Sequence, residues 1–337
     1  MTKREYVIKA IEKQTTDRVP FCIEIGQDII ELYGDRLLRD FPDKSVLEDL
    51  EEGLLSLREA IDLSIGNYIM RSPVHWWFWD RENTDPSYFD PGAEPGVMPA
   101  TTREDTEENL ENDRLHCKWL AGKYQTYMVS FIYASHWEKA NSIRGIEYFL
   151  ADIAGAPEFA QALLDHIIRQ NMNILPKIVD NEYTDAVLFG SDWGTQNDLF
   201  MSPETWDRII MPGEKVQYDL VKASGKRVMV HSCGCIHKIL PKIIGLGVDV
   251  LNPVQPECMD LERLKETYGA DLTFWGGVST QRTLPYGAPD DVRKEVERVI
   301  KLMSKNGGYI TGPSQFIQAD VPYDNLKALI ETARHYS

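Results

Sequence analysis

The chain has 337 residues, 43% of them hydrophobic, and a formal net charge of −17. This length can enclose one large core, but the acidic balance argues against nucleic-acid binding, which requires Lys and Arg on one face. The sequence has no signal segment and no apolar stretch long enough to span a membrane. We therefore expect a cytoplasmic protein, whose five cysteines are reduced.

The N-terminal part predicts a helix over residues 2–13 and a first strand over residues 17–26. Residues 28–57 have a helical pattern, and residues 62–70 resemble a second strand. Glu24 lies near the carboxyl end of the first strand. It is either a catalytic carboxylate at the mouth of a barrel or an exposed loop residue.

Residues 71–124 interrupt this rhythm with several prolines, the aromatic run His75-Trp-Trp-Phe-Trp79 and an acidic patch. We expect a β-rich, aromatic insertion after the second strand, because so long an excursion inside a barrel is unusual and often functional. Trp76 and Trp79 are candidates for stacking against substrate. The alternative is a β-hairpin that packs over the end of the barrel.

Residues 125–136 predict a third strand that ends at His136, and residues 184–193 a fourth that ends in Asp192 and Trp193. Between them, residues 157–179 have apolar positions at helical spacing. Asp192 is a catalytic candidate, because it follows its strand much as His231 follows the next one. His136 and Trp193 are candidates for substrate contact, although His136 also fits a purely structural role.

Residues 226–235 place metal-binding side chains at the end of an apolar strand. Because alternate residues of a strand share a face, His231 and Cys233 should point the same way. Imidazole and thiolate are ligands that Zn²⁺ prefers, and catalytic zinc sites commonly use three protein ligands. Burial of both residues in the core is the alternative.

The C-terminal part repeats a strand-then-helix order, which implies a parallel sheet. The expected strands cover residues 247–256, 270–277 and 307–314, and the expected helices cover residues 236–244, 261–268 and 288–305. In a (β/α)₈ barrel, functional residues follow the carboxyl ends of the strands. Asn252 and Gln255 occupy such positions, Asn252 as a substrate-binding and Gln255 as a catalytic candidate.

Four segments together carry a family resemblance: His231-Ser-Cys-Gly, Gly247-Val-Asp-Val-Leu-Asn-Pro-Val-Gln, Phe274-Trp-Gly-Gly-Val-Ser-Thr-Gln, and Gly307-Gly-Tyr-Ile-Thr-Gly-Pro-Ser with the following Asp320-Val-Pro. They resemble the uroporphyrinogen decarboxylase superfamily, and the His-x-Cys pair resembles the zinc arm of its corrinoid-dependent methyltransferase branch. The resemblance implies one distorted (β/α)₈ barrel domain over residues 1–337, with the insertion at about 71–124. It also implies zinc at His231 and Cys233, a separate corrinoid protein that carries cobalamin, and, by analogy, a homodimer.

The resemblance implies methyl transfer between a small methylated substrate and the corrinoid protein. Thiol-methylating members have a further cysteine near the last strand, whereas residues 312–316 contain none here. A zinc site with one thiolate should be more electrophilic, which favours demethylation of a methyl ether, in particular a methoxylated aromatic. Glu24, Gln255, Glu257 and Cys258 are the candidates to complete the metal site.

Three alternatives remain open. The first is a metal-free decarboxylase that uses Asp192 or Glu24 as acid or base. Residues 23–28 lack the arginines that grip porphyrinogen carboxylates in that branch, which leaves a smaller acid as substrate. The second is a non-catalytic binding barrel. The third is a redox centre at Cys233 and Cys235, which no Cys-x-x-Cys motif supports.

Overall fold

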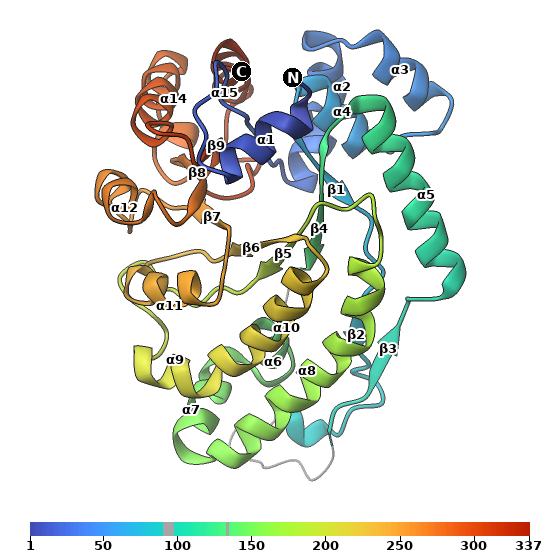
Figure 1. Ribbon diagram of the computed structural model, residues 1–337, viewed down its shortest axis with the longest axis vertical. Coiled ribbons are helices and arrows are strands. Elements are labelled where there is room, and N and C mark those ends of the chain that lie inside the picture. The colour runs from blue at the N-terminus through green and yellow to red at the C-terminus, as the bar shows by residue number, and fades with distance from the viewer. Residues whose placement is uncertain (90–97, 133–134) are drawn as a thin grey trace. The chain divides into compact units, whose positions relative to one another are not determined.

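The computed structural model describes residues 1–89, 98–132 and 135–337, so residues 90–97 of the predicted insertion lie outside the described part. The chain forms two compact units (Figure 1). The terminal unit comprises Met1–Met70, Leu120–Met128 and Asp249–Ser337. The central unit comprises Arg71–Trp119 and Val129–Val248.

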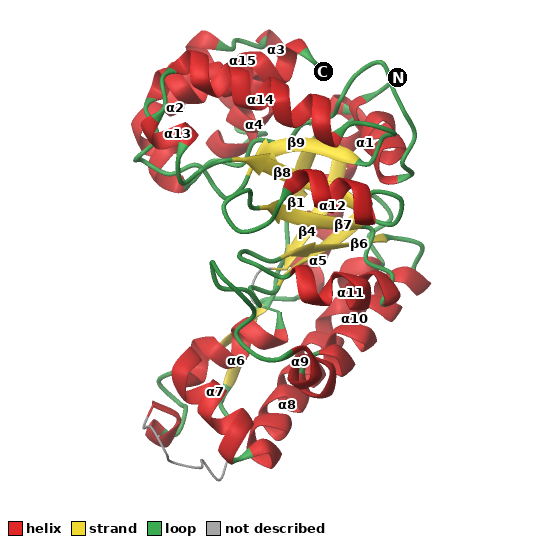
Figure 2. Ribbon diagram, turned by 90° about the vertical axis from the view of Figure 1, so that its left-hand side faces the viewer, coloured by secondary structure: helices red, strands yellow, loops and turns green. Residues whose placement is uncertain are grey.

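The terminal unit contains helices from both ends of the chain and three of the parallel strands. Its elements are α1 (Lys3–Ile11), α2 (Gln27–Asp40), α3 (Lys44–Glu51), α4 (Leu57–Ile65), β7 (Val250–Val254), α12 (Leu261–Tyr268), β8 (Thr273–Val278), α13 (Thr283–Tyr286), α14 (Pro289–Met303), β9 (Tyr309–Pro313) and α15 (Tyr323–His335). Strands β7, β8 and β9 are neighbours in this order. Helix α14 packs on β8 and β9, and α15 packs on α14 (Figure 2).

The central unit has the same alternation of strand and helix. Its elements are β2 (Trp77–Trp79), η1 (Pro86–Phe89), β3 (Thr101–Arg103), α6 (His136–Arg144), α7 (Ile146–Gly155), α8 (Pro157–Val179), β5 (Ala186–Gly190), α9 (Pro203–Ile209), α10 (Met211–Ala223), β6 (Arg227–His231), η2 (His237–Ile239) and α11 (Leu240–Gly245). Three elements have residues in both units: β1 (Ile69–Ser72), α5 (Glu107–Tyr124) and β4 (Tyr127–Ile132).

The predicted strands that flank the candidate site form a parallel sheet. Ala186 of β5 lies opposite Val129 of β4 and Arg227 of β6, and Gly190 lies opposite His231. All five residues of β5 are buried, as are those of β7 and β9. Strands covered on both faces have nearly continuous apolar sequences, which explains why these segments were recognisable.

Three predicted strands differ from the structure. Residues 62–65 belong to α4, which ends at Gly66 with φ +99°, so the second strand begins only at Ile69. The first strand has only isolated bridges, between Phe21 and Thr311 and between Ile25 and Ile317. The third strand is described as far as Ile132, residues 133–134 lie outside the described part, and His136 is the first residue of α6.

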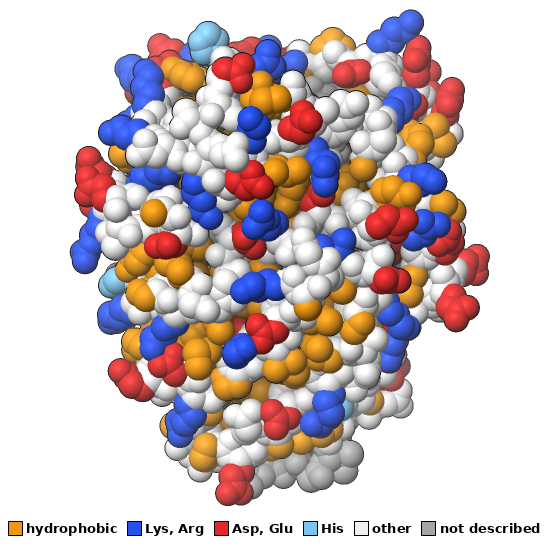
Figure 3. All heavy atoms as spheres, in the orientation of Figure 1, with side chains coloured by type: hydrophobic (Ala, Val, Ile, Leu, Met, Phe, Trp, Pro, Cys, Tyr) orange, Lys and Arg blue, Asp and Glu red, His pale blue; other side chains and the backbone are white. Residues whose placement is uncertain are grey.

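The predicted insertion contains both a β-ribbon and a helix. Trp77 and Trp79 of β2 pair antiparallel with Arg103 and Thr101 of β3. Residues 107–124, however, form the long helix α5. No helix in the described ranges is long and apolar enough to cross a bilayer. Acidic and basic side chains are interspersed on the face shown in Figure 3.

Candidate metal centre

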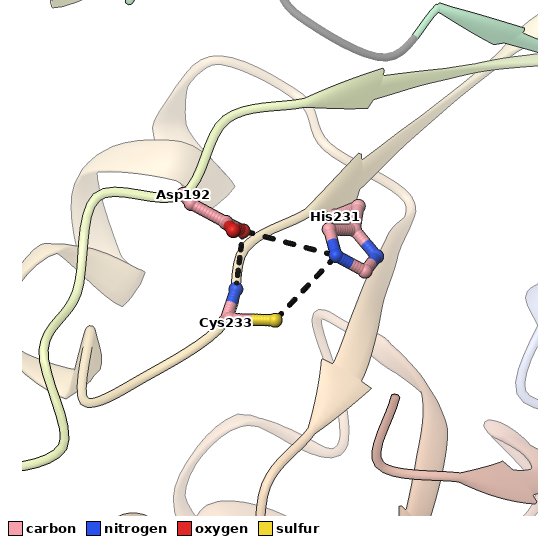
Figure 4. Close-up of side chains that lie close together, drawn as sticks. All are labelled: Asp192, His231 and Cys233. Carbon is pink, nitrogen blue, oxygen red and sulfur yellow. Dashed lines mark hydrogen bonds and ion pairs between the residues drawn. The ribbon is translucent and has the colours of Figure 1, made fainter. Parts of the chain in front are cut away.

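The His-x-Cys pair projects from the end of β6 as the strand period predicts. His231 is the last residue of β6, and Cys233 lies two residues further on. The Cys233 Sγ is 3.6 Å from the His231 Nε2, so both side chains point to one place (Figure 4). The predicted proximity of the two side chains is therefore present, and their role as zinc ligands stays a prediction.

Asp192 joins this pair from the neighbouring strand. It lies two residues beyond β5, and its Oδ1 is 3.7 Å from the His231 Nε2 (Figure 4). The same oxygen accepts a hydrogen bond of 2.8 Å from the backbone N–H of Cys233. The ligand atoms of the three residues all lie within 4.8 Å of one another.

Two of the three separations between these atoms are compatible with a shared zinc ion. In a tetrahedral site with ordinary Zn–N, Zn–S and Zn–O bonds, nitrogen and sulfur are about 3.5 Å apart, and nitrogen and oxygen about 3.3 Å. The observed 3.6 Å and 3.7 Å are close to these values, and the His231–Asp192 distance is too long for a hydrogen bond. The Asp192 side chain is 44% exposed, so the cluster is open on one side. Open coordination is typical of catalytic zinc.

Two glycines allow the loops that carry these ligands to touch. A Cβ on Gly194 would lie 2.8 Å from the Cys235 backbone nitrogen, and one on Gly234 would lie 2.5 Å from the carbonyl carbon of Gly194. Gly234 also has φ +83°, a conformation that other residues avoid. The Cys235 N–H donates to the Thr195 carbonyl at 2.7 Å. This backbone contact fixes Asp192 beside Cys233.

Four predicted substrate contacts lie in the central unit and differ in burial. Trp193 and His136 are fully buried: Trp193 packs edge-on against Trp206, and the His136 Nδ1 lies 3.3 Å from a Glu214 oxygen. Trp76 is also buried, at 6% exposure.

Trp79 is half-buried, and its indole N–H donates to the Lys139 carbonyl at 2.9 Å. Trp79 thus keeps the most accessible ring of the four, and the substrate roles stay predictions.

Glu24, Asn252 and Gln255 belong to the terminal unit. Asn252 lies in the middle of β7 and Gln255 directly follows its last residue, and both are buried. The Glu24 carbonyl accepts a hydrogen bond from the Ile317 N–H, which places this residue at the end of the first-strand segment. Their catalytic and substrate-binding roles stay predictions.

The predicted candidates for the third ligand also include Glu257 and Cys258. Ser279 donates its hydroxyl hydrogen bond to Glu257, and the Cys258 thiol lies 3.6 Å from the Gln255 carbonyl. In the described ranges, the group of candidate ligands that lie together contains Asp192, and the roles of Glu257 and Cys258 stay predictions. The equivalent placement of Asp192 and His231 on adjacent strands was the sequence signal for this proximity, and the catalytic role of Asp192 stays a prediction.

Parallel strands that alternate with helices, together with a His, Cys and Asp cluster beyond two strand ends, define an α/β barrel-type protein with a candidate metal centre. The sequence model described as uroporphyrinogen decarboxylase (URO-D) matches residues 125–336, and the chain therefore belongs to this family of enzymes.

One relative agrees with this assignment in sequence, and one solved structure shares the fold. A uroporphyrinogen decarboxylase from Carboxydothermus hydrogenoformans is 24% identical over 245 residues, which cover 72% of this chain and 67% of that protein. A methyltransferase structure from Methanosarcina mazei has a TM-score of 0.68 at 18% identity, covering 100% of this chain and 99% of its own. The predicted α/β barrel class is thereby confirmed.

Proposed function

We propose that the chain is a zinc-dependent methyltransferase, the O-demethylase component that moves a methyl group from a small methoxylated aromatic to a separate corrinoid protein. The observation that carries this proposal is the convergence of Asp192, His231 and Cys233 at metal-ligand spacing. The resemblance of the His-x-Cys segment to the corrinoid-dependent branch and the fold shared with a methyltransferase support it.

The donor set suits the activation of an ether oxygen. When bound, zinc supplies a Lewis acid that polarises the oxygen of the methyl ether. The cluster offers one thiolate, one carboxylate and one imidazole, so less charge reaches the ion than from two thiolates. The N–H of Cys233 holds the Asp192 oxygen in place, and the exposed side of the cluster leaves room for substrate. In this proposal Trp76 and Trp79 stack against the aromatic ring of the substrate. Gln255 and Glu24 are the catalytic groups.

The decisive experiment is elemental analysis of the purified protein beside Cys233→Ala and, as a matched control, Cys235→Ser. We expect about one zinc per chain in the parent and the control, and little in Cys233→Ala. The loaded parent should then convert a reduced corrinoid protein to its methylated form when a methoxylated aromatic is supplied, which is followed by absorbance. Zinc-free protein after incubation with zinc would exclude this function.

A metal-free decarboxylase is the second candidate, because the curated relative is named as a uroporphyrinogen decarboxylase. The structure adds one favourable feature. Although residues 23–28 contain no arginine, Arg58 of α4 reaches this segment and donates to the Ile25 carbonyl at 2.9 Å. Release of CO₂ from a small carboxylic acid by zinc-free protein, undiminished in Cys233→Ala, would favour this candidate. Saturable ligand binding without turnover would indicate a binding barrel.

A further inference from the structure

The first turn of α6 holds the backbone of Asp192 from both sides. The indole N–H of Trp137 donates to the Asp192 carbonyl at 2.9 Å. The Glu138 carboxylate accepts the Asp192 N–H at 3.1 Å. Neither residue belongs to the group of candidate ligands. Asp192 therefore has its two backbone polar groups bound by adjacent residues of one helix.

The residues before Asp192 are tied to the same helix start. The Ser135 N–H donates to the Gly190 carbonyl at 3.0 Å, and the hydroxyls of Ser135 and Ser191 are 2.8 Å apart. The Ser191 N–H donates to the His231 carbonyl at 2.8 Å. The exit of β5 is thus bound to α6 on one side and to β6 on the other.

The two α6 side chains are themselves held in place to different degrees. Trp137 is fully buried, with its ring 5.7 Å from that of Phe149 and 6.3 Å from that of Phe200. Its indole N–H therefore has a fixed direction. Glu138 is half-buried, and its carboxylate is oriented so that it accepts the Asp192 N–H.

Resting on the proposed function, we propose that Trp137 and Glu138 are positioning residues that hold Asp192 as the third zinc ligand. Asp192 comes from a loop, and an aspartate that follows its strand by two residues has freedom to rotate away from His231 and Cys233. The N–H and the carbonyl of Asp192 are both hydrogen-bonded, so its backbone is held in place. The carboxylate therefore stays in position to accept the hydrogen bond from the Cys233 N–H. Residues that orient metal ligands in this way commonly change metal affinity by about 10- to 100-fold when replaced.

A purely structural role would produce different consequences. If these contacts only joined α6 to β5, their loss would lower stability without a specific effect on the Asp192 carboxylate. A double-mutant cycle with Asp192→Ala separates the two roles, because a positioning effect disappears once the positioned ligand is gone.

The test measures zinc affinity by competition with a chromophoric chelator in the full-length protein. Glu138→Leu removes the acceptor and should weaken zinc binding by about 10- to 100-fold, whereas Glu138→Gln keeps an acceptor oxygen and should retain most of the affinity. Glu147→Leu, which removes an exposed acid from the first turn of α7, should have no effect. In the Asp192→Ala background, Glu138→Leu should change nothing further. Co²⁺ substitution should show the same loss of an oxygen ligand in the visible spectrum.

If Glu138→Leu does not fold, the double-mutant cycle with Asp192→Ala is repeated with Trp137→Phe, which keeps an aromatic ring but lacks the N–H. An equal loss of affinity with and without Asp192, or no loss in either background, would overturn the positioning role while leaving the zinc function intact. A parent protein that binds no zinc would overturn both proposals.

Discussion

At the scale of single residues, the main result is that the carboxylate of Asp192, a catalytic candidate in the sequence, lies beside the His231–Cys233 pair. Asp192 was recognisable as a polar residue at a strand end, and the strand register places it opposite the His231–Cys233 pair. Sequence spacing alone identifies ligands on one strand, because their separation is fixed by the backbone. It cannot identify which of several strand-end acids approaches them.

We predict that Asp192→Asn weakens zinc binding by at least about tenfold, because a neutral amide is a poorer ligand than a carboxylate. Competition with a chelator measures this change. Asp198→Asn is the matched control, since the Asp198 carboxylate in the same loop pairs with Lys238 instead. An equal effect of both substitutions would indicate a general charge effect and not coordination.

The burial of Lys139 leads us to predict that the stability of the protein depends on pH. Lys139 is 5% exposed, its ammonium donates to the Trp77 carbonyl at 2.6 Å, and burial lowers the pKa of Lys139 to about 8 from the ordinary 10.5. Between these two pH values the unfolded chain holds a proton that the folded chain has lost, so stability rises with pH. Below about pH 8 both states are protonated and the cost of burying the charge is fully present.

The measurement is urea denaturation of the parent and Lys139→Met between about pH 8 and pH 10. The free energy of unfolding of the parent should gain up to about 1.4 kcal/mol per pH unit over the variant. Burial also lowers the pKa of Lys3 and Lys265 to about 8, but both are present in the two proteins, so the difference isolates Lys139. Parallel pH profiles would contradict the prediction.

At the scale of elements, the contact between two strand-exit loops depends on glycine. Gly234→Ala would force a Cβ against the backbone of Gly194 in addition to straining φ. Gly225 has a similar φ of +80° but open space around it, so Gly225→Ala isolates the conformational cost of about 1 kcal/mol. We expect Gly234→Ala to cost more than this control in chemical denaturation, and to be the only one of the two that weakens zinc binding. If both substitutions had equal effects on stability and on zinc binding, the close contact between the two loops would not matter for the site.

Helix α4 was the clearest error among the predicted elements. Its start follows a recognised pattern, since Ser56 accepts the Glu59 N–H and Glu59 accepts the Ser56 N–H. The apolar residues from Ala60 to Ile65 resemble a strand locally, but burial of one helical face decides their conformation. Ser56→Ala should lower the free energy of unfolding by about 1 kcal/mol. Glu59→Gln, which keeps an acceptor, should cost less; the reverse order would argue against the cap.

At the scale of the whole molecule, the net charge of −17 should make stability sensitive to salt. Like charges repel in the compact state, and added salt screens this repulsion. We expect the thermal midpoint to rise when NaCl is increased from about 10 mM to about 150 mM. The opposing contribution comes from surface ion pairs between the interspersed charges seen in Figure 3, which salt weakens. A fall in the midpoint would show that these pairs dominate.

The sequence by itself determined the parallel α/β pattern, the approximate positions of strands β5 to β9 and the His231–Cys233 pair. Each depends on local chemistry: buried parallel strands are continuously apolar, and alternate residues of a strand share a face. The family resemblance added the barrel class, which the match over residues 125–336 and the shared fold confirm.

Only the tertiary structure decided which residue joins that pair and what holds it. Asp192 and Cys233 are separated by 40 residues of chain, yet adjacent strands and a glycine-to-glycine contact bring them within hydrogen-bond distance. The support from Trp137 and Glu138 comes from a third segment, whose helix begins where the sequence had predicted the end of a strand. Such long-range proximity follows from packing, which has no signature in local periodicity.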